Sequence, residues 1–122
     1  MNLKSKIKTK DSNNNQRGQL AEQQANRYLQ QQGLVLCDKN FRCRSGEIDL
    51  IMRDGDCLVF IEVRYRKSST FGGAAASVDQ KKQHKIRQSA ESYLQQKQLN
   101  TACRFDVIAM SQEKIEWFRG AF

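Results

Sequence analysis

The sequence predicts a single α/β domain in which helices flank a mixed β-sheet, with the element order α-β-β-β-α-β-β. Three observations support this fold class. Residues 18–32 and 78–98 each place apolar side chains on one face at helical spacing. Asp54-Gly55 separates two alternating apolar runs, which is a strong signal for a β-hairpin. The chain has 122 residues, enough for one hydrophobic core but not for two domains.

The first predicted helix covers residues 18–32 and ends at Gly33, because glycine readily adopts the backbone conformation that terminates helices. Glu22 lies at the edge of its apolar face, which is formed by Ala21, Ala25, Tyr28 and Leu29. Residues 1–16 carry spaced lysines and a run of asparagines and offer little to bury, which predicts a disordered basic tail. The folded domain should therefore comprise residues 17–122.

Along the chain, strands are expected both before and after the second predicted helix, residues 78–98. A short Gly-rich segment at residues 68–76 should lead into this helix as a loop. Three strands precede the loop and two follow the helix; they cover residues 34–44, 46–53, 56–66, 104–110 and 114–118.

The composition favours a soluble protein that meets polyanions. Twenty-one lysines and arginines stand against 13 aspartates and glutamates, a formal net charge of +8. Such an excess attracts nucleic acid, DNA being expected before RNA, with an anionic membrane or mere solubility as the alternatives. No apolar run approaches the roughly 20 residues needed to cross a bilayer. The N-terminus also lacks the apolar core of a secretory signal. We therefore expect a cytoplasmic protein with no membrane partner.

The four cysteines do not have the spacing of a structural zinc site. Cys37, Cys43, Cys57 and Cys103 form no C-x-x-C pair, whereas zinc ligands usually come in tighter pairs. In a cytoplasmic chain this pattern predicts buried or half-buried free thiols.

The predicted hairpin places several acidic side chains together. With Asp54 and Gly55 as a two-residue turn, Asp49 would lie opposite Phe60 and Glu47 opposite Glu62. Asp49 and Glu62 would then be diagonal neighbours whose carboxyl groups can reach a common point. One face of the hairpin would carry Glu47, Asp49, Leu58, Phe60, Glu62 and Arg64.

Two interpretations of this face remain open from spacing alone. Facing carboxylates destabilise a sheet unless they are neutralised, and a hard cation such as Mg²⁺ or Mn²⁺ would do so. Arg64 would then hold a substrate phosphate. In the other interpretation the acids form a solvated strand face paired with nearby arginines. Leu58 and Phe60 weigh against a solvated face, because they place the acids beside apolar surface.

Several motifs, in order, resemble the YraN family of small bacterial proteins. They are RGQLAEQQANRYLQQQG, NFRCRSGEIDLI, LVFIEVRYR, FGGAAASVDQKK, RFDVIAM and the terminal IEWFRGAF, which together cover nearly everything from residue 17 to residue 122. This largely uncharacterised family is assigned by similarity to the restriction-endonuclease-like fold, near archaeal Holliday-junction resolvases. The resemblance therefore implies a nuclease-like fold with a D…E-x-K motif and a glutamate on the first helix. Because junction-cleaving relatives act as dimers, a homodimer is one option.

The resemblance also implies roles for individual residues. Glu22 would be the acid on the helix, Asp49 the metal-binding aspartate and Glu62 the glutamate of E-x-K, with Arg64 at the lysine position. In such nucleases the lysine is thought to orient or activate water. Arginine stays protonated and cannot act as a base, although it can hold a phosphate with two hydrogen bonds. The fold is compatible with this change, whereas catalysis is placed in question.

Other residues carry weaker predictions. Glu47 is either a fourth metal ligand or a partner of Arg42 or Arg44, and Asp106 on a late strand is interpreted as a structural acid. His84, among lysines, is interpreted as a solvated residue. Phe71-Gly72-Gly73 either closes over a substrate backbone or forms an ordinary connection. The predicted phosphate-contacting residues, besides Arg64, are Arg66, Lys81, Lys82, Lys85 and Arg87.

Three hypotheses of function follow. The first is an endonuclease that uses Mg²⁺ or Mn²⁺ on structured or branched nucleic acid. The second is a nucleic-acid-binding module of the same fold that has lost catalysis, as Arg64 suggests. The third is an adaptor for another protein, with the positive charge incidental. All three share one fold, and fold does not fix function.

Overall fold

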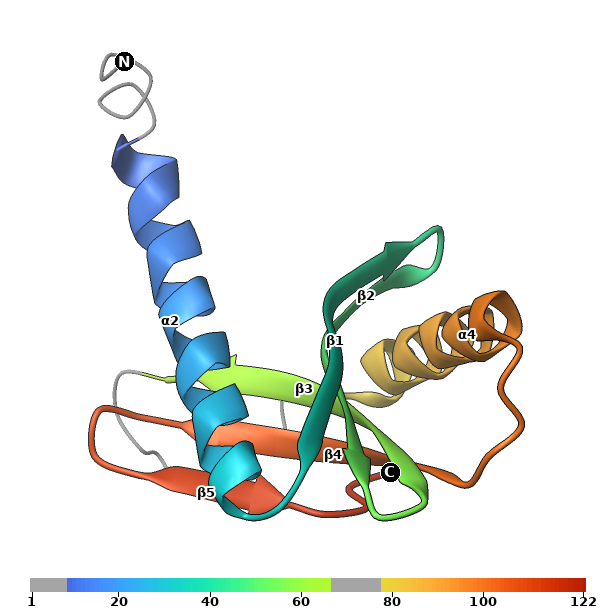
Figure 1. Ribbon diagram of the computed structural model, residues 1–122. Helices are drawn as coiled ribbons and strands as arrows, with labels where there is room; N and C mark the ends of the chain where they lie inside the picture. Colours follow the sequence, from blue (N-terminus) through green and yellow to red (C-terminus); the bar gives the residue numbers. More distant parts are fainter. Residues whose placement is uncertain (1–8, 67–77) are drawn as a thin grey trace, which may run out of the picture.

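The computed structural model describes residues 9–66 and 78–122, with side chains from residue 18 onward within these ranges. In Figure 1 the described chain forms a mixed sheet with helices on both of its faces. The predicted fold class and element order are confirmed. The elements are α2 (Thr9–Gln31), β1 (Val35–Cys43), β2 (Gly46–Asp54), β3 (Cys57–Tyr65), α4 (Gln80–Lys97), β4 (Cys103–Met110) and β5 (Ile115–Phe118).

The strands lie in the sheet in the same order as in the sequence, β1-β2-β3-β4-β5. β1, β2 and β3 pair antiparallel through two hairpins. β3 and β4 are parallel, because α4 lies between them and carries the chain back to the start of the sheet. β5 returns antiparallel to β4 and forms one edge. β3, at the centre, is therefore covered on both faces.

The two helices pack on opposite faces of the sheet and make two separate cores. α2 buries Ala21, Ala25 and Leu29 against one face, as its predicted apolar stripe requires. α4 buries Ile86, Ala90 and Tyr93 against the other face, again as predicted. The strand residues under α2 include Leu50, Met52, Val59 and Ile61, and those under α4 include Ile48, Ile51, Leu58 and Phe60.

α2 begins earlier than predicted. The helix starts at Thr9, so the backbone is helical over residues 9–16, where a disordered tail was expected. Neither proline nor glycine occurs between Thr9 and Gln16, so nothing in the sequence terminates a helix that extends outward from the packed segment. The remainder of the predicted tail, residues 1–8, lies outside the described residues.

The turn between β2 and β3 differs from the prediction by one position. Gly55 and Asp56 form the turn, and Asp54 pairs with Cys57. Gly55 has φ +62°, and a turn with a positive φ at its first central position favours glycine there over Asp54. Each β2 residue consequently pairs two residues further along β3 than expected.

This register corrects two predicted pairs. Ile51, not Asp49, lies opposite Phe60, and the last recorded pair of the ladder is Leu50 with Ile61. One further step along the strands brings Asp49 opposite Glu62, so these acids are direct and not diagonal neighbours. Glu47 does not face Glu62.

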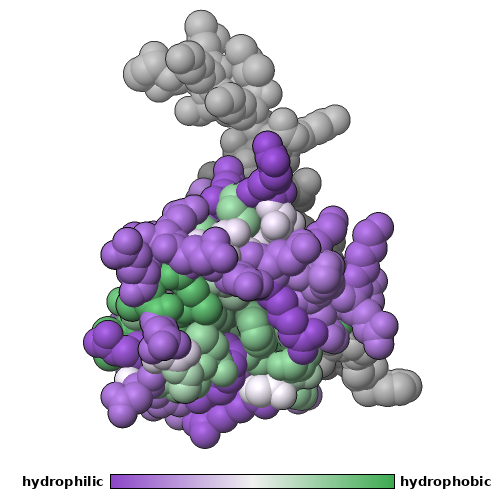
Figure 2. Space-filling view, turned by 90° about the vertical axis from the view of Figure 1, so that its right-hand side faces the viewer, coloured by the Kyte–Doolittle hydropathy of each residue, from purple (hydrophilic) through white to green (hydrophobic). Residues whose placement is uncertain are grey.

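One face of the molecule combines polar and apolar side chains. Figure 2 shows that hydrophilic side chains cover most of the face turned to the viewer, with hydrophobic residues showing between them. None of the helices in the described ranges combines the length and apolar character needed to span a bilayer. All four cysteines are free thiols; Cys43, Cys57 and Cys103 are half-buried as predicted, whereas Cys37 is exposed.

Candidate functional site

The candidate site lies where β2 diverges from β3. The backbone ladder between these strands ends at Leu50 and Ile61, while β2 continues with β1 to Gly46 (Figure 1). Buried side chains of β2 also change face here, since Ile48 packs toward α4 and Leu50 toward α2. Asp49 occupies the point of divergence.

Asp49 and Glu62 form the centre of the site. Glu62 is buried, with 6% of its surface exposed, whereas Asp49 is half-buried. The Oδ2 atom of Asp49 accepts a hydrogen bond of 2.8 Å from the backbone N–H of Val63. The two carboxyl groups lie close enough for each to affect the pKa of the other.

Burial raises the pKa of Asp49 to about 8, and the negative charge of Glu62 adds to this effect. Glu22 and Glu47 raise the pKa further, whereas the Val63 hydrogen bond lowers it. Four carboxyl groups therefore influence one another at this place. Repulsion between clustered carboxyl groups is typical of functional sites, where a bound cation or a reaction makes use of their shifted pKa values.

Two cations compensate Glu62. Burial raises the pKa of Glu62, while Lys82 and then Arg64 lower it. Arg64 Nε lies 3.2 Å from Glu62 Oε2, and Lys82 Nζ lies 3.8 Å from the same oxygen. Lys82 extends from α4 and Arg64 from β3, so both elements bring positive charge to one carboxylate. A phosphate entering here would meet both cations.

Glu22 and Glu47 are connected through Asn40, a residue that the sequence did not reveal. Asn40 Nδ2 donates to Glu22 Oε1 at 2.8 Å and lies 3.5 Å from Glu47 Oε2. Asn40 has φ +52°, a left-handed conformation that is costly for a non-glycine residue within a strand. Apart from glycine, asparagine is among the residues that tolerate this backbone best, and Asn40 also begins the family motif NFRCRSGEIDLI; neither signal indicated its contacts with the two glutamates.

Glu47 also has the arginine partner that the sequence suggested. Arg42 Nε lies 3.8 Å from Glu47 Oε1 in an exposed ion pair. Within residues 9–66 and 78–122, no three His, Cys, Asp or Glu side chains form a group that could hold a metal ion. The structure thus brings Asp49 and Glu62 together as a pair, with Glu22 and Glu47 farther out.

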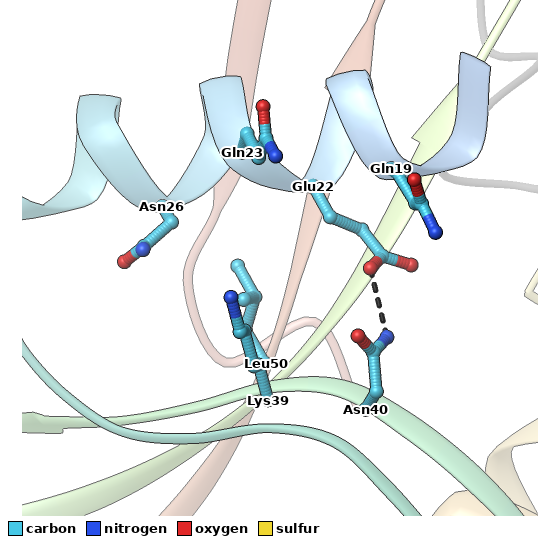
Figure 3. A pocket seen from close by; sticks show the side chains of 7 residues that line it. All are labelled: Gln19, Glu22, Gln23, Asn26, Lys39, Asn40 and Leu50. Atoms are coloured by element: carbon cyan, nitrogen blue, oxygen red, sulfur yellow. Dashed lines mark hydrogen bonds between the residues drawn. The ribbon is translucent and has the colours of Figure 1, made fainter. Parts of the chain in front are cut away.

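A polar groove extends from Glu22 between α2 and β1. Figure 3 shows Glu22 reaching from the helix to Asn40 on the strand, with Asn26 and Lys39 farther along the same groove. Its volume is about 290 Å³. The full lining comprises Gln19, Glu22, Gln23, Asn26, Lys39, Asn40 and Leu50.

Comparison with known sequences places the chain in a family. Residues 21–110 match the uncharacterised protein family UPF0102. The chain belongs to this family. It is the family that the motifs of the sequence resemble, also called YraN.

Several UPF0102 proteins from bacteria are similar to the chain over most of its length. One from Herminiimonas arsenicoxydans is 52% identical over 85% of this chain and 84% of its own. One from Shewanella frigidimarina is 54% identical over 86% of this chain and 97% of its own. One from Nitrosomonas eutropha is 52% identical over 91% of this chain and 97% of its own. The names of these proteins assign no activity.

The predicted basic residues of this UPF0102 chain separate into two groups. Lys82 pairs with Glu62, and Lys81 and Lys85 are exposed on the same helix. Arg87 instead lies over the rings of Phe105 and Phe122, at 5.8 and 5.4 Å from their centroids. It thus contacts the C-terminal aromatic residues and not the carboxylates.

The remaining predicted residues are also placed. Arg66 is exposed just beyond the end of β3, two residues after Arg64, and His84 is exposed on α4. Asp106 is fully buried and accepts hydrogen bonds from Arg104, Trp117 and Gly120, in keeping with a structural role. The Phe71-Gly72-Gly73 segment lies outside the described residues.

Proposed function

We propose that this protein is a divalent-metal-dependent endonuclease that acts on structured or branched nucleic acid, with DNA as the expected substrate. One observation carries the proposal. Asp49 and Glu62 are adjacent, poorly hydrated carboxyl groups, and the pKa of Asp49 is raised to about 8. A divalent cation between them would favour the ionised form of both groups and remove the repulsion.

The oxygen donors fit Mg²⁺ or Mn²⁺. Mg²⁺ is usually held by one or two carboxylates and completed by water and phosphate oxygens. Asp49 and Glu62 would supply these carboxylates, and the charges of Glu22 and Glu47, which act on Asp49, would add to the attraction for a cation. When bound, the cation would neutralise charge on the phosphate and promote ionisation of a water molecule.

Arg64 and Lys82 would orient the phosphate. Both cations now contact the same oxygen of Glu62. Once a divalent cation neutralises the Glu62 carboxylate, the guanidinium group of Arg64 and the ammonium group of Lys82 would be available to bind the nonbridging oxygens of a phosphodiester. Arg64 stays protonated and would therefore stabilise negative charge without acting as a base.

A second candidate is a nucleic-acid-binding module of the same fold without catalysis. The specific observation in its favour is that Arg64 and Lys82 already compensate Glu62 without a metal ion. Nucleic acid would then be held by the net charge of +8 alone. In either case a homodimer, which would present two sites to a branched substrate, stays a prediction.

The deciding experiment is cleavage of labelled linear, flapped and four-way DNA with Mn²⁺, Mg²⁺ or EDTA. Wild type should cut with metal and not with EDTA, and Asp49→Ala should abolish cutting. Asp56→Ala is the matched control, because Asp56 is an exposed acid in the turn of the same hairpin. Binding without cutting, equal in wild type and Asp49→Ala, would instead support the non-catalytic module.

A further inference from the structure

Asn40 turns its side chain toward α2 through an unusual backbone conformation. Consecutive residues of a strand normally point to opposite faces of the sheet, yet Lys39 and Asn40 both line the groove beneath α2 (Figure 3). The next residue, Phe41, packs against the ring of Tyr93 from α4, on the other face. The φ of Asn40, +52°, accounts for the departure from strand alternation. This left-handed conformation costs free energy, and such strain is concentrated at functional sites.

The Asn40 amide joins two glutamates from different elements. Its Nδ2 atom donates to Glu22 Oε1 of α2 at 2.8 Å and lies 3.5 Å from Glu47 Oε2 of β2. Within the described part of the chain, the Glu22 carboxylate has no other hydrogen-bond or ion-pair partner, whereas Glu47 also pairs with Arg42. The orientation of the half-buried Glu22 side chain therefore depends on Asn40.

An amide holds the two acids together without neutralising them. The two N–H bonds of one amino group can serve two carboxylates at once. A lysine or arginine at this position would bring a positive charge that opposes the binding of a cation. Because Asn40 is uncharged, the negative charges of Glu22 and Glu47 remain available to a cation. Hydrogen bonds of this kind, from residues outside the metal shell, commonly orient the acids of metal sites.

Asn40 also lies in line with the central carboxyl pair. The recorded ladder pairs on either side of it place Asn40 opposite Asp49 of β2. Asp49 in turn lies opposite Glu62 of β3, one step beyond the last recorded pair of that ladder. The three residues thus form one row across three neighbouring strands, in which facing Cα atoms are about 4.5–5.5 Å apart. An acid bonded to the Asn40 side chain is therefore held next to this row.

We propose that Asn40 is a positioning residue of the carboxylate site, whose amide holds Glu22 and Glu47 beside Asp49 so that their charges strengthen the binding of a divalent cation. Asn40 acts through the two glutamates and does not itself bind the cation. This role rests on the proposed function, because it presupposes a cation at Asp49 and Glu62. Removing the amide should therefore weaken cation binding without destabilising the fold.

The test measures Mn²⁺ affinity by calorimetric titration of the full chain without nucleic acid, together with Tm. Asn40→Gly removes the amide but suits the left-handed backbone, so its Tm should equal or exceed that of wild type. Its dissociation constant for Mn²⁺ should rise about tenfold, as is typical when a residue that orients a metal ligand is replaced. A merely structural role predicts the reverse, a lower Tm with unchanged Mn²⁺ affinity.

Gln98→Gly is the matched control. Gln98 follows the last turn of α4 and is, with Asn40, one of the two described non-glycine residues with positive φ, here +54°. The substitution relieves the same kind of strain at the end of α4 that is opposite to Lys82, so Mn²⁺ affinity should not change. Loss of Mn²⁺ binding in Asp49→Ala identifies the titrated site as the carboxylate pair.

A double-mutant cycle tests whether Asn40 acts through Glu22. In a Glu22→Ala background, Asn40→Gly should weaken Mn²⁺ binding by less than about twofold, because the main partner of the amide is already absent. A full tenfold loss in that background would overturn the proposed role, and so would an unchanged Mn²⁺ affinity of the single variant Asn40→Gly.

The outcomes separate this role from catalysis. Weaker Mn²⁺ binding by Asn40→Gly, together with no cleavage by wild type, would support the role of Asn40 and contradict the endonuclease. Metal-dependent cleavage by wild type, with equal Mn²⁺ affinity in Asn40→Gly, would support the endonuclease and overturn the role of Asn40. Absence of Mn²⁺ binding by wild type would contradict both.

Discussion

Asp49 reaches across to the neighbouring strand, where its Oδ2 atom accepts a 2.8 Å hydrogen bond from the backbone N–H of Val63. The side chain of Asp49 thus binds a backbone donor of β3 just beyond the last recorded pair of the ladder, Leu50 with Ile61. The bond fixes the carboxyl group beside Glu62 even though the strands diverge there. The carboxylate of Asp49 thereby supplies an acceptor for the Val63 N–H at the place where the two strands separate.

The first prediction concerns stability against pH in the absence of metal. The folded protein binds the Asp49 proton more tightly than the unfolded chain does, because the pKa rises to about 8 on folding. The contribution of Asp49 to the free energy of unfolding should therefore be largest below about pH 4 and fall as the pH rises toward 8. The fall attributable to Asp49 is at most about 6 kcal/mol, since its pKa rises from 3.8 to about 8 and one pKa unit corresponds to about 1.4 kcal/mol.

Urea unfolding in EDTA at a series of pH values measures this effect. Asp49→Asn should remove most of the slope between pH 4 and 8, because the substituted amide does not titrate. Asp56→Asn, which changes an exposed acid in the β2–β3 turn, should retain the wild-type slope. A wild-type slope in Asp49→Asn would show that the carboxyl pair does not control stability in this range.

Much of this arrangement could be predicted because of the two-residue period of strands. The predicted turn was displaced by one position, which moved the register by two residues. A register shift of two residues keeps every side chain on the same face of the sheet, so Asp49 and Glu62 remain neighbours. The prediction failed on which residues lie opposite each other, because that depends on the φ of Gly55 and not on the apolar pattern.

Asn40 could not be predicted for a different reason. Its contacts with Glu22 and Glu47 join a helix to two strands, and its φ of +52° follows from that packing. The spacing of residues along one segment does not indicate contacts with residues that are distant in the sequence. Arg87 shows the same limit, because helical spacing grouped it with Lys81 and Lys85 whereas the C-terminal Phe122 determines its contacts. Glu22 was found through family resemblance and not through spacing.

The second prediction concerns Arg64. Arg64→Ala should lower the rate of metal-dependent cleavage about a hundredfold, as expected when one charged contact to a transition state is removed. Arg64→Lys should cleave at least as fast as wild type, because lysine keeps the charge and can also lose its proton. Arg53→Ala, which changes an exposed arginine at the far end of β2, is the control. Full activity of Arg64→Ala would exclude Arg64 from phosphate stabilisation.

The third prediction concerns the exposed lysines of α4. Lys81 and Lys85 lie on the helix that brings Lys82 to Glu62, so they should contact phosphates that flank the site. Replacing both with alanine should weaken DNA binding and reduce the slope of log K against log salt by about one per lost contact. Titrations at several KCl concentrations measure this slope.

Lys97→Ala provides the comparison, because Lys97 is in the last turn of the same helix and lies 5.8 Å from the ring centroid of Tyr93. It should leave the salt slope unchanged. Arg87→Ala should reduce stability through its lost contacts with Phe105 and Phe122. An unchanged slope in the Lys81, Lys85 variant would place the nucleic acid on another surface.

The fourth prediction concerns Asp106, which holds the C-terminal end of the chain to the sheet. Its carboxylate is fully buried and accepts hydrogen bonds from Arg104 Nε, Trp117 Nε1 and the backbone N–H of Gly120. Asp106→Asn places an amino group against one of these donors and removes one of the two carboxylate partners of the half-buried Arg104, which also pairs with Asp54 at 2.9 Å. The free energy of unfolding should fall by about 2–4 kcal/mol.

Trp117 is the only tryptophan in the chain, so its fluorescence reports this change during urea unfolding. Glu116→Gln, at an exposed neighbour paired with Lys114, should change stability by less than about 1 kcal/mol. At temperatures where Asp106→Asn stays folded, its cleavage should equal that of wild type, since Asp106 contacts none of the four site acids. A loss of cleavage without a loss of stability would mean that the C-terminal strand communicates with the carboxylate site.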